Sequence, residues 1–423
     1  MKLENGCRVV VVGGGPAGSC TALHLLRLAH ATGLRLEVIV LEARDFSRPG
    51  PGGCNKCAGI LSSTAVRNLK KLDLVLPPEV IQARLDEYIL HLGDAEVTIH
   101  QPDPERQIYS VYRGSGPRLG QFPARSFDGW LLDKARERGA IVRRAHVQRI
   151  IPAARPIVAT AHEQIEADLV VLAAGVNSRC PVDEAWGYKP PQTETMAQDE
   201  MPKPPGFHDG VHIYLHDPPG LIFGGLIPKG PYLNISLLGH HLPDSAMNDF
   251  LQAHDLVRAY PDGKPLLCGC APRVVVAPAT GYYADRFVAV GDAATTRLYK
   301  DGIGTALITA EAAARTAIEL GVSRADFAAG YRPVCHHVMA DNRYGELLFR
   351  LWNIPSHSSF LLGAWRRTLA VEARRPAQAR VHTRLLWGLF TGDASYRAIF
   401  MRLASPLALL SFVRGTLAPG NSR

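Results

Sequence analysis

The sequence predicts an α/β protein with three parts: a nucleotide-binding domain built on a parallel sheet, an inserted domain with an antiparallel sheet, and a helical C-terminal region. Three observations support this prediction. The chain opens with a buried strand, a glycine-rich turn, a helix and a second buried strand. Strand-like segments follow at 85–112 and 211–238. From residue 343 onward, arginines are mixed with large apolar residues, a pattern typical of amphipathic helices.

The turn after the first strand carries the strongest motif. Four valines precede Gly13, Gly15 and Gly18, which fill the pattern G-x-G-x-x-G. The first glycine permits a tight turn, the second lets a pyrophosphate approach the backbone, and the third lets the helix pack on the strand. The helix expected over 16–30, with Ala17 in its first turn, points its positive end at the phosphates. The turn therefore predicts a dinucleotide site.

An acidic residue closes the second strand, which is expected over 36–41. Glu42 lies 24 positions after Gly18. A carboxylate there can accept hydrogen bonds from the ribose hydroxyls of an adenosine, and it would repel a 2′-phosphate. A glycine-rich turn in another kind of βαβ unit does not explain this residue. From this motif alone, both NAD and FAD remain candidates.

The bulk composition is that of a folded protein of two or three domains, with 423 residues, 47% of them hydrophobic and 20% charged. The first strand begins by about Arg8, so we expect no signal peptide. We expect most of the eight cysteines to be reduced and the protein to be cytoplasmic.

Positive charge is concentrated at the C-terminal end. Residues 343–423 hold 12 arginines, no lysine and three acidic residues, a net charge of +9 against +8 for the whole chain. No run of 343–415 approaches the roughly 20 apolar residues of a membrane span. Such helices suit the inner face of an anionic membrane, from which a lipid-like substrate would be taken. The alternative is a helical cap that exposes its arginines. Nucleic acid is not an expected partner, because no fold for binding it is recognisable.

Two further stretches decide between the nucleotides. One buried strand ends in Gly175, and another ends in Gly291-Asp292. Arg125 stands in the sequence Arg-Ser-Phe-Asp-Gly-Trp-Leu. Together with the N-terminal turn, these look like the FAD-binding elements of the p-hydroxybenzoate-hydroxylase-like flavoproteins, and the resemblance covers most of 8–320. It implies a Rossmann-like domain that binds FAD.

The resemblance also implies roles for individual residues. Asp292 would bind a ribityl hydroxyl, although it could equally cap a helix. Arg125 would lie near the FAD chain. A helix starting at Gly302, Ile303 and Gly304 would place its positive end beside the flavin pyrimidine ring, where it would stabilise the negative charge of the reduced flavin.

Within this superfamily the chain is most similar to the geranylgeranyl reductases. Residues 54–60, Cys-Asn-Lys-Cys-Ala-Gly-Ile, resemble their cysteine–glycine motif near the flavin, with Ala58 in place of a glycine. Residues 226–239 and 389–396 resemble two later stretches of that family. The resemblance implies an FAD-dependent reductase that saturates isoprenoid C=C bonds of a geranylgeranyl-type lipid, a prenyl quinone or a diphosphate. Reduced flavin would supply the hydride, and the site would supply a proton.

The cysteines of this motif have several interpretations. Cys57 could donate the proton or simply hold the loop, and Cys54 and Cys57 could form a redox disulfide. A zinc site shared with Cys268 and Cys270 is a weaker alternative, because C-x-C is not the usual second ligand pair.

Two other functions remain open. The first is a flavin monooxygenase or halogenase, although of the halogenase stretch Trp-x-Trp-x-Ile-Pro only Ile227-Pro228 is present. The second is an electron-transfer or redox-sensing flavoprotein in which Cys54 and Cys57 cycle. No second G-x-G-x-x-G occurs, so the electron donor, which is NAD(P)H, a ferredoxin or a quinol, has no nucleotide domain of its own.

The motifs predict a discontinuous domain organisation. The proline-rich stretch 187–207 shows no clear period, and we expect it to be a connection. The FAD-binding domain comprises 1–75, 113–185 and 276–330, the inserted substrate domain comprises 76–112 and 186–275, and the basic helical region comprises 331–423.

Overall fold

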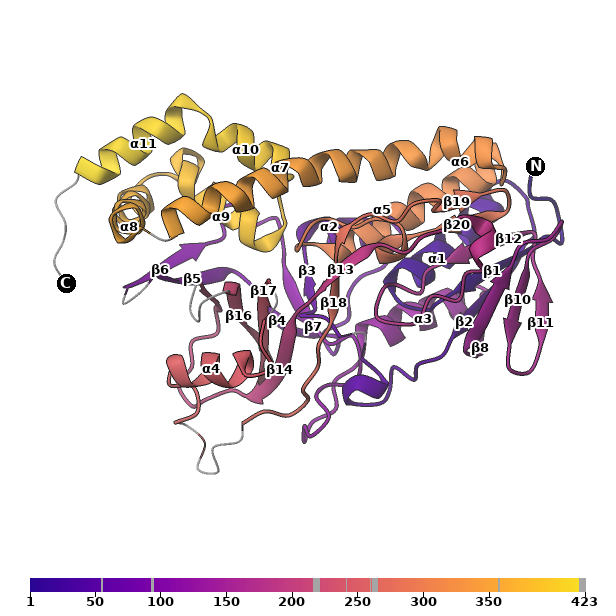
Figure 1. The fold of residues 1–423 in the computed structure, drawn as a ribbon, viewed down its shortest axis with the longest axis horizontal. Helices are drawn as coiled ribbons and strands as arrows, with labels where there is room; N and C mark the ends of the chain where they lie inside the picture. The colour runs from indigo at the N-terminus through magenta and orange to yellow at the C-terminus, as the bar shows by residue number, and fades with distance from the viewer. Residues whose placement is uncertain are drawn as a thin grey trace. The chain divides into compact units, whose positions relative to one another are not determined.

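The computed structural model describes residues 1–417, except 55, 93–94, 216–220, 241, 259, 261–264 and 357 (Figure 1). Asn55 of the cysteine motif therefore lies outside the described residues. The chain forms two compact units. The parallel-sheet unit comprises Met1–Ile81, Val111–Glu194 and Pro272–Met339, and the mixed-sheet unit comprises Gln82–Ser110, Thr195–Ala271 and Ala340–Arg423.

The parallel-sheet unit is built on a six-stranded sheet in the order β19-β20-β12-β1-β2-β8. All neighbouring pairs are parallel except β19–β20 at the edge. The valines of β1 are almost completely buried, as expected for a strand covered on both faces. The strands are β1 (Arg8–Val12), β2 (Glu37–Glu42), β8 (Ile141–Arg144), β12 (Leu169–Leu172), β19 (Tyr283–Ala284) and β20 (Phe287–Ala289).

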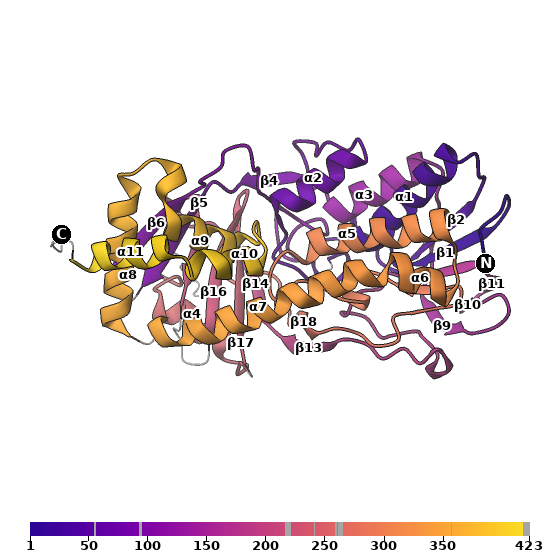
Figure 2. The same ribbon diagram turned by 90° about the horizontal axis from the view of Figure 1, so that it is seen from above.

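Helix α1 (Pro16–Ala31) packs against both α3 (Phe127–Glu137) and α5 (Gly302–Arg315) (Figure 2). Its sequence is rich in alanine and leucine, and its N-terminal half is buried. The remaining elements of the unit are α2 (Ser63–Lys71), α6 (Arg324–Gly330), the short helices η1 (Gly50–Gly52), η2 (Glu184–Trp186), η3 (Gly291–Ala293) and η4 (Thr316–Leu320), and the strands β3 (Ile60–Leu61), β9 (Val147–Ile151), β10 (Ile157–Thr160), β11 (Gln164–Glu166), β13 (Gln192–Thr195) and β18 (Arg273–Ala277). The chain first passes between the units within β4 (Ile81–Arg84) and returns within β7 (Tyr109–Val111), and three further passages follow after Glu194, Ala271 and Met339.

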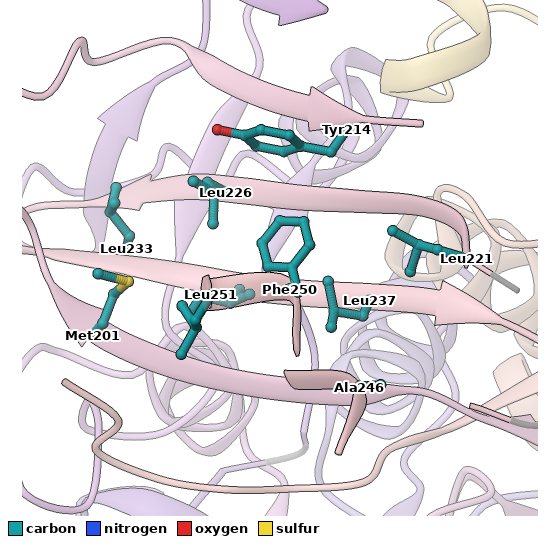
Figure 3. Close-up of a cluster of buried hydrophobic side chains, with 10 residues drawn as sticks. Met201, Tyr214, Leu221, Leu226, Leu233, Leu237, Ala246, Phe250 and Leu251 are labelled. Atoms are coloured by element: carbon teal, nitrogen blue, oxygen red, sulfur yellow. The ribbon is translucent and has the colours of Figure 1, made fainter. Parts of the chain in front are cut away.

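The mixed-sheet unit contains a six-stranded sheet in the order β14-β17-β16-β15-β5-β6. It is antiparallel except for the parallel pair β15–β5. Helix α4 (Ala246–Ala253) covers one face, where Phe250 packs among Leu226, Leu237 and Tyr214 (Figure 3). The strands are β5 (Glu87–Leu92), β6 (Ala95–His100), β14 (Ala197–Pro202), β15 (Val211–Tyr214), β16 (Leu221–Lys229) and β17 (Tyr232–Gly239).

The prediction of a connection over 187–207 is wrong, because β14 lies within it and pairs with β17. Its polar residues Asp199 and Glu200 are buried, so the strand does not show the apolar pattern of a core strand. Lys229, which is 1% exposed, lies 3.7 Å from Glu200 and offsets its charge. A partner that is distant in sequence therefore offsets the cost of burying the charge of this strand. The sequence also predicts a helix over 244–260, whereas α4 covers only Ala246–Ala253.

The C-terminal helices are α7 (Arg332–Ser356), α8 (Ser359–Ala373), α9 (Val381–Thr391), α10 (Tyr396–Leu403) and α11 (Pro406–Leu417), with the short η5 (Ala377–Ala379). Although the sequence prediction treats 331–423 as a separate region, the structure groups residues from Ala340 onward with the mixed sheet. Tyr88 of β5 packs edge-on against Trp387 of α9, with 5.3 Å between ring centroids. Among the described residues, no single helix is long and apolar enough to cross a membrane, but α10 and α11 together, bent by 58°, meet that requirement.

Candidate functional site

At two glycine positions of the motif, the structure leaves no room for a side chain. Gly13 has φ +105°, and a Cβ there would lie 2.5 Å from the carbonyl oxygen of Ala173 at the end of β12. A Cβ on Gly18 would lie 1.8 Å from the carbonyl oxygen of Gly13. The first and third glycines therefore hold β1, α1 and β12 close together, as the motif predicts.

Glu42 holds the turn from the neighbouring strand. Its Oε2 accepts a hydrogen bond from the Gly14 N–H at 2.7 Å, and its Oε1 accepts one from the Arg44 N–H at 2.7 Å. The side chain is half-buried, and each oxygen has a further lone pair. At the start of α1, Gly15 provides no side-chain cap, and the first turn contains no acidic residue. The helix therefore presents a positive end beside a carboxylate that can still accept hydrogen bonds.

The other predicted FAD-binding stretches reach the same end of the sheet. Gly291 has φ +59°, and a Cβ there would lie 2.9 Å from the Cβ of Ala17 in α1. A Cβ on Gly302 would lie 3.7 Å from Asp292 Oδ1. Gly175, with φ +62°, lies three residues after the last residue of β12. Motifs separated by more than 250 positions in the sequence thus meet in the parallel-sheet unit.

Asp292 lies in the 3-10 turn that leads from β20 toward α5. Burial raises the pKa of its carboxyl group, whereas the charge of Arg113 and a hydrogen bond from Thr296 lower it, and the net pKa lies above its ordinary value. A buried carboxylate of this kind gains from additional hydrogen-bond donors. A sugar-like polyol would provide them.

Helix α5 begins at Gly302, where the sequence predicts a helix N-terminus. Its N-cap is Asp301, whose side chain accepts a hydrogen bond from the Gly304 N–H at 3.1 Å. Ser62 donates to the same carboxylate at 2.6 Å. A Cβ on Gly304 would lie 2.4 Å from Asp301 Oδ1, and Ile303 is 5% exposed. This capping carboxylate is a site residue outside the predicted set, although Asp is a preferred N-cap residue.

The cysteine loop contains two half-buried thiols. Cys54 Sγ accepts a hydrogen bond from the Lys56 N–H at 3.2 Å, and Cys57 Sγ accepts one from the Gly59 N–H at 3.4 Å. Ala58 is half-buried between them and β3. The two thiols are not joined by a disulfide.

The loop packs against the segment that follows β7. A Cβ on Gly114 would lie 2.8 Å from the backbone nitrogen of Cys54. Among the described residues, no group of three or more His, Cys, Asp or Glu side chains is placed to hold a metal.

Arg113 is the site residue that the sequence analysis missed. Its Nη2 lies 2.8 Å from Oδ2 of Asp128, whose side chain is fully buried. The pKa of Arg113 lies above its ordinary value. Burial lowers this pKa, but the charge and hydrogen bonds of Asp128 raise it, and Cys57 and Cys54 raise it further. Arg113 therefore lies within electrostatic reach of both cysteines and of Asp292. The available sequence signal was an arginine directly before a glycine at the end of a strand.

Arg125 lies in a different environment. It pairs with Glu79 at 2.5 Å, and both side chains are about half exposed. An exposed pair of this kind is worth little energy. Its predicted position near the FAD chain stays a prediction, whereas Arg113 is largely buried and its charge acts on Asp292.

These polar groups fit a dinucleotide with two polyols joined by a pyrophosphate. Glu42 offers carboxylate oxygens at one end, Asp292 offers a half-buried carboxylate at the other, and the uncapped start of α1 contacts both motifs through Gly14 and Ala17. This is the pattern of acceptors and positive charge that FAD requires.

Comparisons with known proteins agree with this fold. No protein-family model matches the chain. The chain is 24% identical over 359 residues to the protein FixC of Azotobacter vinelandii, which covers 76% of this chain and 78% of FixC. A flavoprotein/dehydrogenase from Cytophaga hutchinsonii superposes with a TM-score of 0.65 and 16% identity over 97% of this chain and 98% of that chain. A geranylgeranyl bacteriochlorophyll reductase-like protein from Thermoplasma acidophilum superposes with a TM-score of 0.55 and 15% identity over 98% and 96%.

Flavin-dependent halogenases and an oxygenase are also among the structural neighbours. The chain therefore has the fold shared by these flavin-dependent oxidoreductases. The predicted fold class is confirmed, and the predicted resemblance to the geranylgeranyl reductases and their superfamily is confirmed as a likeness of fold.

Proposed function

We propose that the protein is an FAD-dependent oxidoreductase. The observation that carries this proposal is the convergence of the glycine turn, Glu42 and Asp292 at one end of the parallel sheet. In this assignment Glu42 accepts hydrogen bonds from the adenosine ribose, the start of α1 faces the pyrophosphate, and Asp292 accepts from a ribityl hydroxyl. The flavin supplies the capacity to pass a hydride to or from an organic substrate.

A substitution of Glu42 tests the cofactor assignment. Glu42→Gln keeps the shape of the side chain but loses a charge-assisted hydrogen-bond acceptor, so FAD affinity should fall by about tenfold. Titration of the FAD-free protein, followed by flavin fluorescence, measures this. The matched control is Glu37→Gln at the other end of β2, where the side chain pairs with Arg8. No FAD binding by the unmodified protein, or equal binding by both variants, would contradict the assignment.

We further propose that the substrate is an isoprenoid and that the reaction saturates its C=C bonds. The geranylgeranyl bacteriochlorophyll reductase-like neighbour supports this over nearly the full length of both chains. The pair Cys54 and Cys57 beside the buried Arg113 supports it from within the site. Cys57 is assigned as the proton donor to the alkene carbon, and Cys54 shapes the loop through its contact with the Lys56 N–H.

An anaerobic experiment tests the reaction. The bound flavin is reduced chemically, and its absorbance is followed after addition of a geranylgeranyl lipid or menaquinone, and separately after addition of oxygen. Reoxidation by the alkene with a saturated product supports the reductase. Rapid reoxidation by oxygen alone, with a transient peroxyflavin, would instead indicate a monooxygenase or halogenase.

The role of Cys57 needs a separate measurement. Cys57→Ala should slow alkene-dependent reoxidation by at least about 10²-fold, the typical contribution of a positioned acid. Cys7→Ala, which removes a free thiol next to β1, is the control and should leave the rate unchanged. Full activity in Cys57→Ala would rule out the proton-donor assignment, and loss of activity in both variants would show a general effect on folding.

Finally, we propose that α11 contacts a lipid surface. Leu407, Leu410 and Leu417 are 67%, 52% and 80% exposed. Two of the three acidic residues after position 343, Glu372 and Asp393, are buried, so the exposed charge of this region is strongly positive. Leu407→Ser with Leu410→Ser should reduce co-sedimentation with anionic liposomes. Unchanged sedimentation would contradict the proposal.

A further inference from the structure

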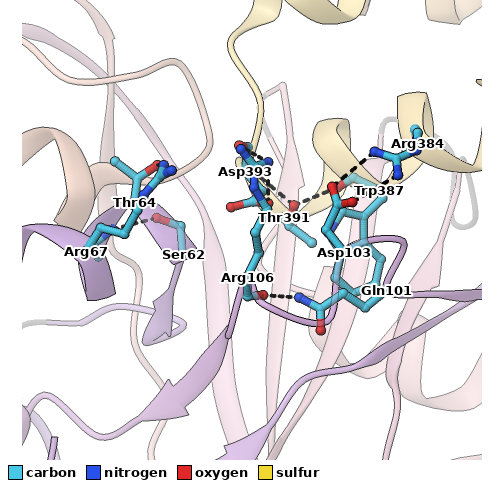
Figure 4. Close-up of polar contacts among 11 residues, drawn as sticks. Ser62, Thr64, Arg67, Gln101, Asp103, Arg106, Arg384, Trp387, Thr391 and Asp393 are labelled. Atoms are coloured by element: carbon cyan, nitrogen blue, oxygen red, sulfur yellow. Dashed lines mark hydrogen bonds and ion pairs between the residues drawn. The ribbon is translucent and has the colours of Figure 1, made fainter. Parts of the chain in front are cut away.

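A pocket in the mixed-sheet unit lies outside the proposed flavin site. It is formed by α9, α10 and the segment after β6, and its volume is about 290 Å³. This is the lower end of the range for small-molecule pockets, so it suits a compact chemical group. Three arginines, Arg106, Arg384 and Arg402, line it, and Figure 4 shows the first two with their partners.

Two of these arginines are held firmly in place. Arg384 forms two hydrogen bonds with Asp103, at 2.9 and 3.0 Å, and donates from Nε to the Ala377 carbonyl at 3.1 Å. Arg106 Nη1 donates to Asp393 at 2.9 Å, and Gln101 donates to the backbone carbonyl of Arg106. Guanidinium groups fixed in this way lose little freedom when they bind a ligand.

Arg402 differs from the other two. Among the residues that the structure describes, its guanidinium group has no hydrogen bond or ion pair. Burial lowers the pKa of Arg402, the like charges of Arg384 and Arg106 lower it further, and Asp103 raises it. Two carboxylates thus offset two of the three positive charges, which leaves one uncompensated cation in the pocket.

The arginines also retain unused hydrogen-bond donors. Each guanidinium group has five N–H donors. In the described part of the chain, the guanidinium group of Arg106 donates only through Nη1, and the guanidinium group of Arg402 makes no hydrogen bond. The apolar wall comes from Pro102, Trp387 and Ala398. The pocket therefore combines an excess positive charge, free planar donors and a volume that excludes a long chain.

We propose that this pocket binds a phosphoryl group, either a free phosphate or diphosphate or the phosphoryl headgroup of a lipid. Arginine forks match the oxygens of a phosphoryl group in geometry and charge. A bound anion would supply the partner that Arg402 lacks and reduce the repulsion among the three arginines. The proposal does not depend on the flavin chemistry.

Calorimetric titration of the full chain with inorganic pyrophosphate tests the proposal. Arg402→Ala should weaken binding by about tenfold or more, as expected for the loss of a charge-assisted hydrogen bond. The matched control is Arg397→Ala, because Arg397 is exposed on the same helix and does not line the pocket. It should change binding less than about twofold, since a rim charge acts mainly by long-range attraction. Thermal unfolding of both variants checks that α10 stays folded.

A second arm identifies the source of the phosphoryl group. Liposomes of phosphatidylcholine with and without phosphatidic acid are compared for both variants. The site is supported if Arg402→Ala loses the binding of pyrophosphate or of phosphatidic acid liposomes and Arg397→Ala keeps that binding. The ligand whose binding is lost identifies the source of the phosphoryl group. The proposal is overturned if the unmodified protein binds neither source, or if both variants bind equally.

Discussion

At the scale of single residues, the predicted cofactor site depends on side chains that are far apart in the sequence and close together in the folded chain. Glu42 was identifiable because its position after the second strand has a chemical meaning in a dinucleotide site. Arg113 was not identifiable, because its importance comes from burial beside Asp128 and from its nearness to Cys57. Burial and nearness are properties of the folded chain, so a single sequence without that fold does not reveal them.

The Arg113–Asp128 pair leads to a prediction about stability. Arg113→Ala leaves a fully buried carboxylate without its cation, and it should lower the free energy of unfolding by about 3–5 kcal/mol. Arg113→Met combined with Asp128→Leu removes both charges and should recover most of that loss. Denaturant unfolding measures each value.

The half-exposed pair Arg125–Glu79 is the control for that experiment. Arg125→Ala should cost less than about 1 kcal/mol, because solvent already screens the pair. A loss for Arg113→Ala as small as that for Arg125→Ala would show that the buried pair contributes little to stability.

At the scale of secondary-structure elements, the prediction succeeded where the sequence pattern is local. The strand–turn–helix from Arg8 to Ala31 follows from consecutive valines, a glycine turn and an alanine- and leucine-rich run. It failed at β14, whose buried Asp199 and Glu200 read as surface residues in the sequence. This strand is stabilised by Lys229 and by pairing with β17, and both lie about 30 positions or more after β14 in the sequence.

Glu372 shows how one buried residue joins three C-terminal helices. It lies in α8, and its carboxylate accepts hydrogen bonds from the His382 and Thr383 N–H groups at the start of α9 and from Ser411 of α11. Glu372→Ala should lower the free energy of unfolding by about 3 kcal/mol, because these donors would lose a charged acceptor in the interior. Glu346→Ala, an exposed acid on α7, should leave it nearly unchanged. Equal denaturation midpoints for the two variants would refute this role.

At the scale of the whole molecule, His24 should make stability depend on pH. It is buried in α1, and burial is the main reason that its pKa falls from 6.5 to about 4. The negative charge of Glu311 raises the pKa, and the positive charges of Arg27, Lys71 and Arg138 lower it. Between these values the unfolded chain binds the proton more readily than the folded chain. Stability should therefore fall as the pH falls from about 6.5 to about 4, by up to about 3 kcal/mol.

Unfolding curves across that pH range test the effect. His24→Leu removes the titrating group and should flatten the pH dependence, whatever its effect on stability at neutral pH. His30→Leu alters an exposed histidine at the end of the same helix and should leave the dependence as it is. An unaltered slope in His24→Leu would assign the pH dependence to other groups.

The class of fold, the nucleotide motif and the concentration of positive charge in the last fifth of the chain can each be recognised in the sequence alone. Each of these is recorded in neighbouring residues, through hydrophobic period, glycine spacing or local composition. The folded structure was needed to show that Arg113 pairs with a buried carboxylate, that β14 belongs to a sheet, and that the Arg402 guanidinium has no hydrogen bond or ion pair among the residues the structure describes. These features depend on contacts between segments far apart in the chain, and the free energy of a buried charge is set by those contacts rather than by its sequence neighbours.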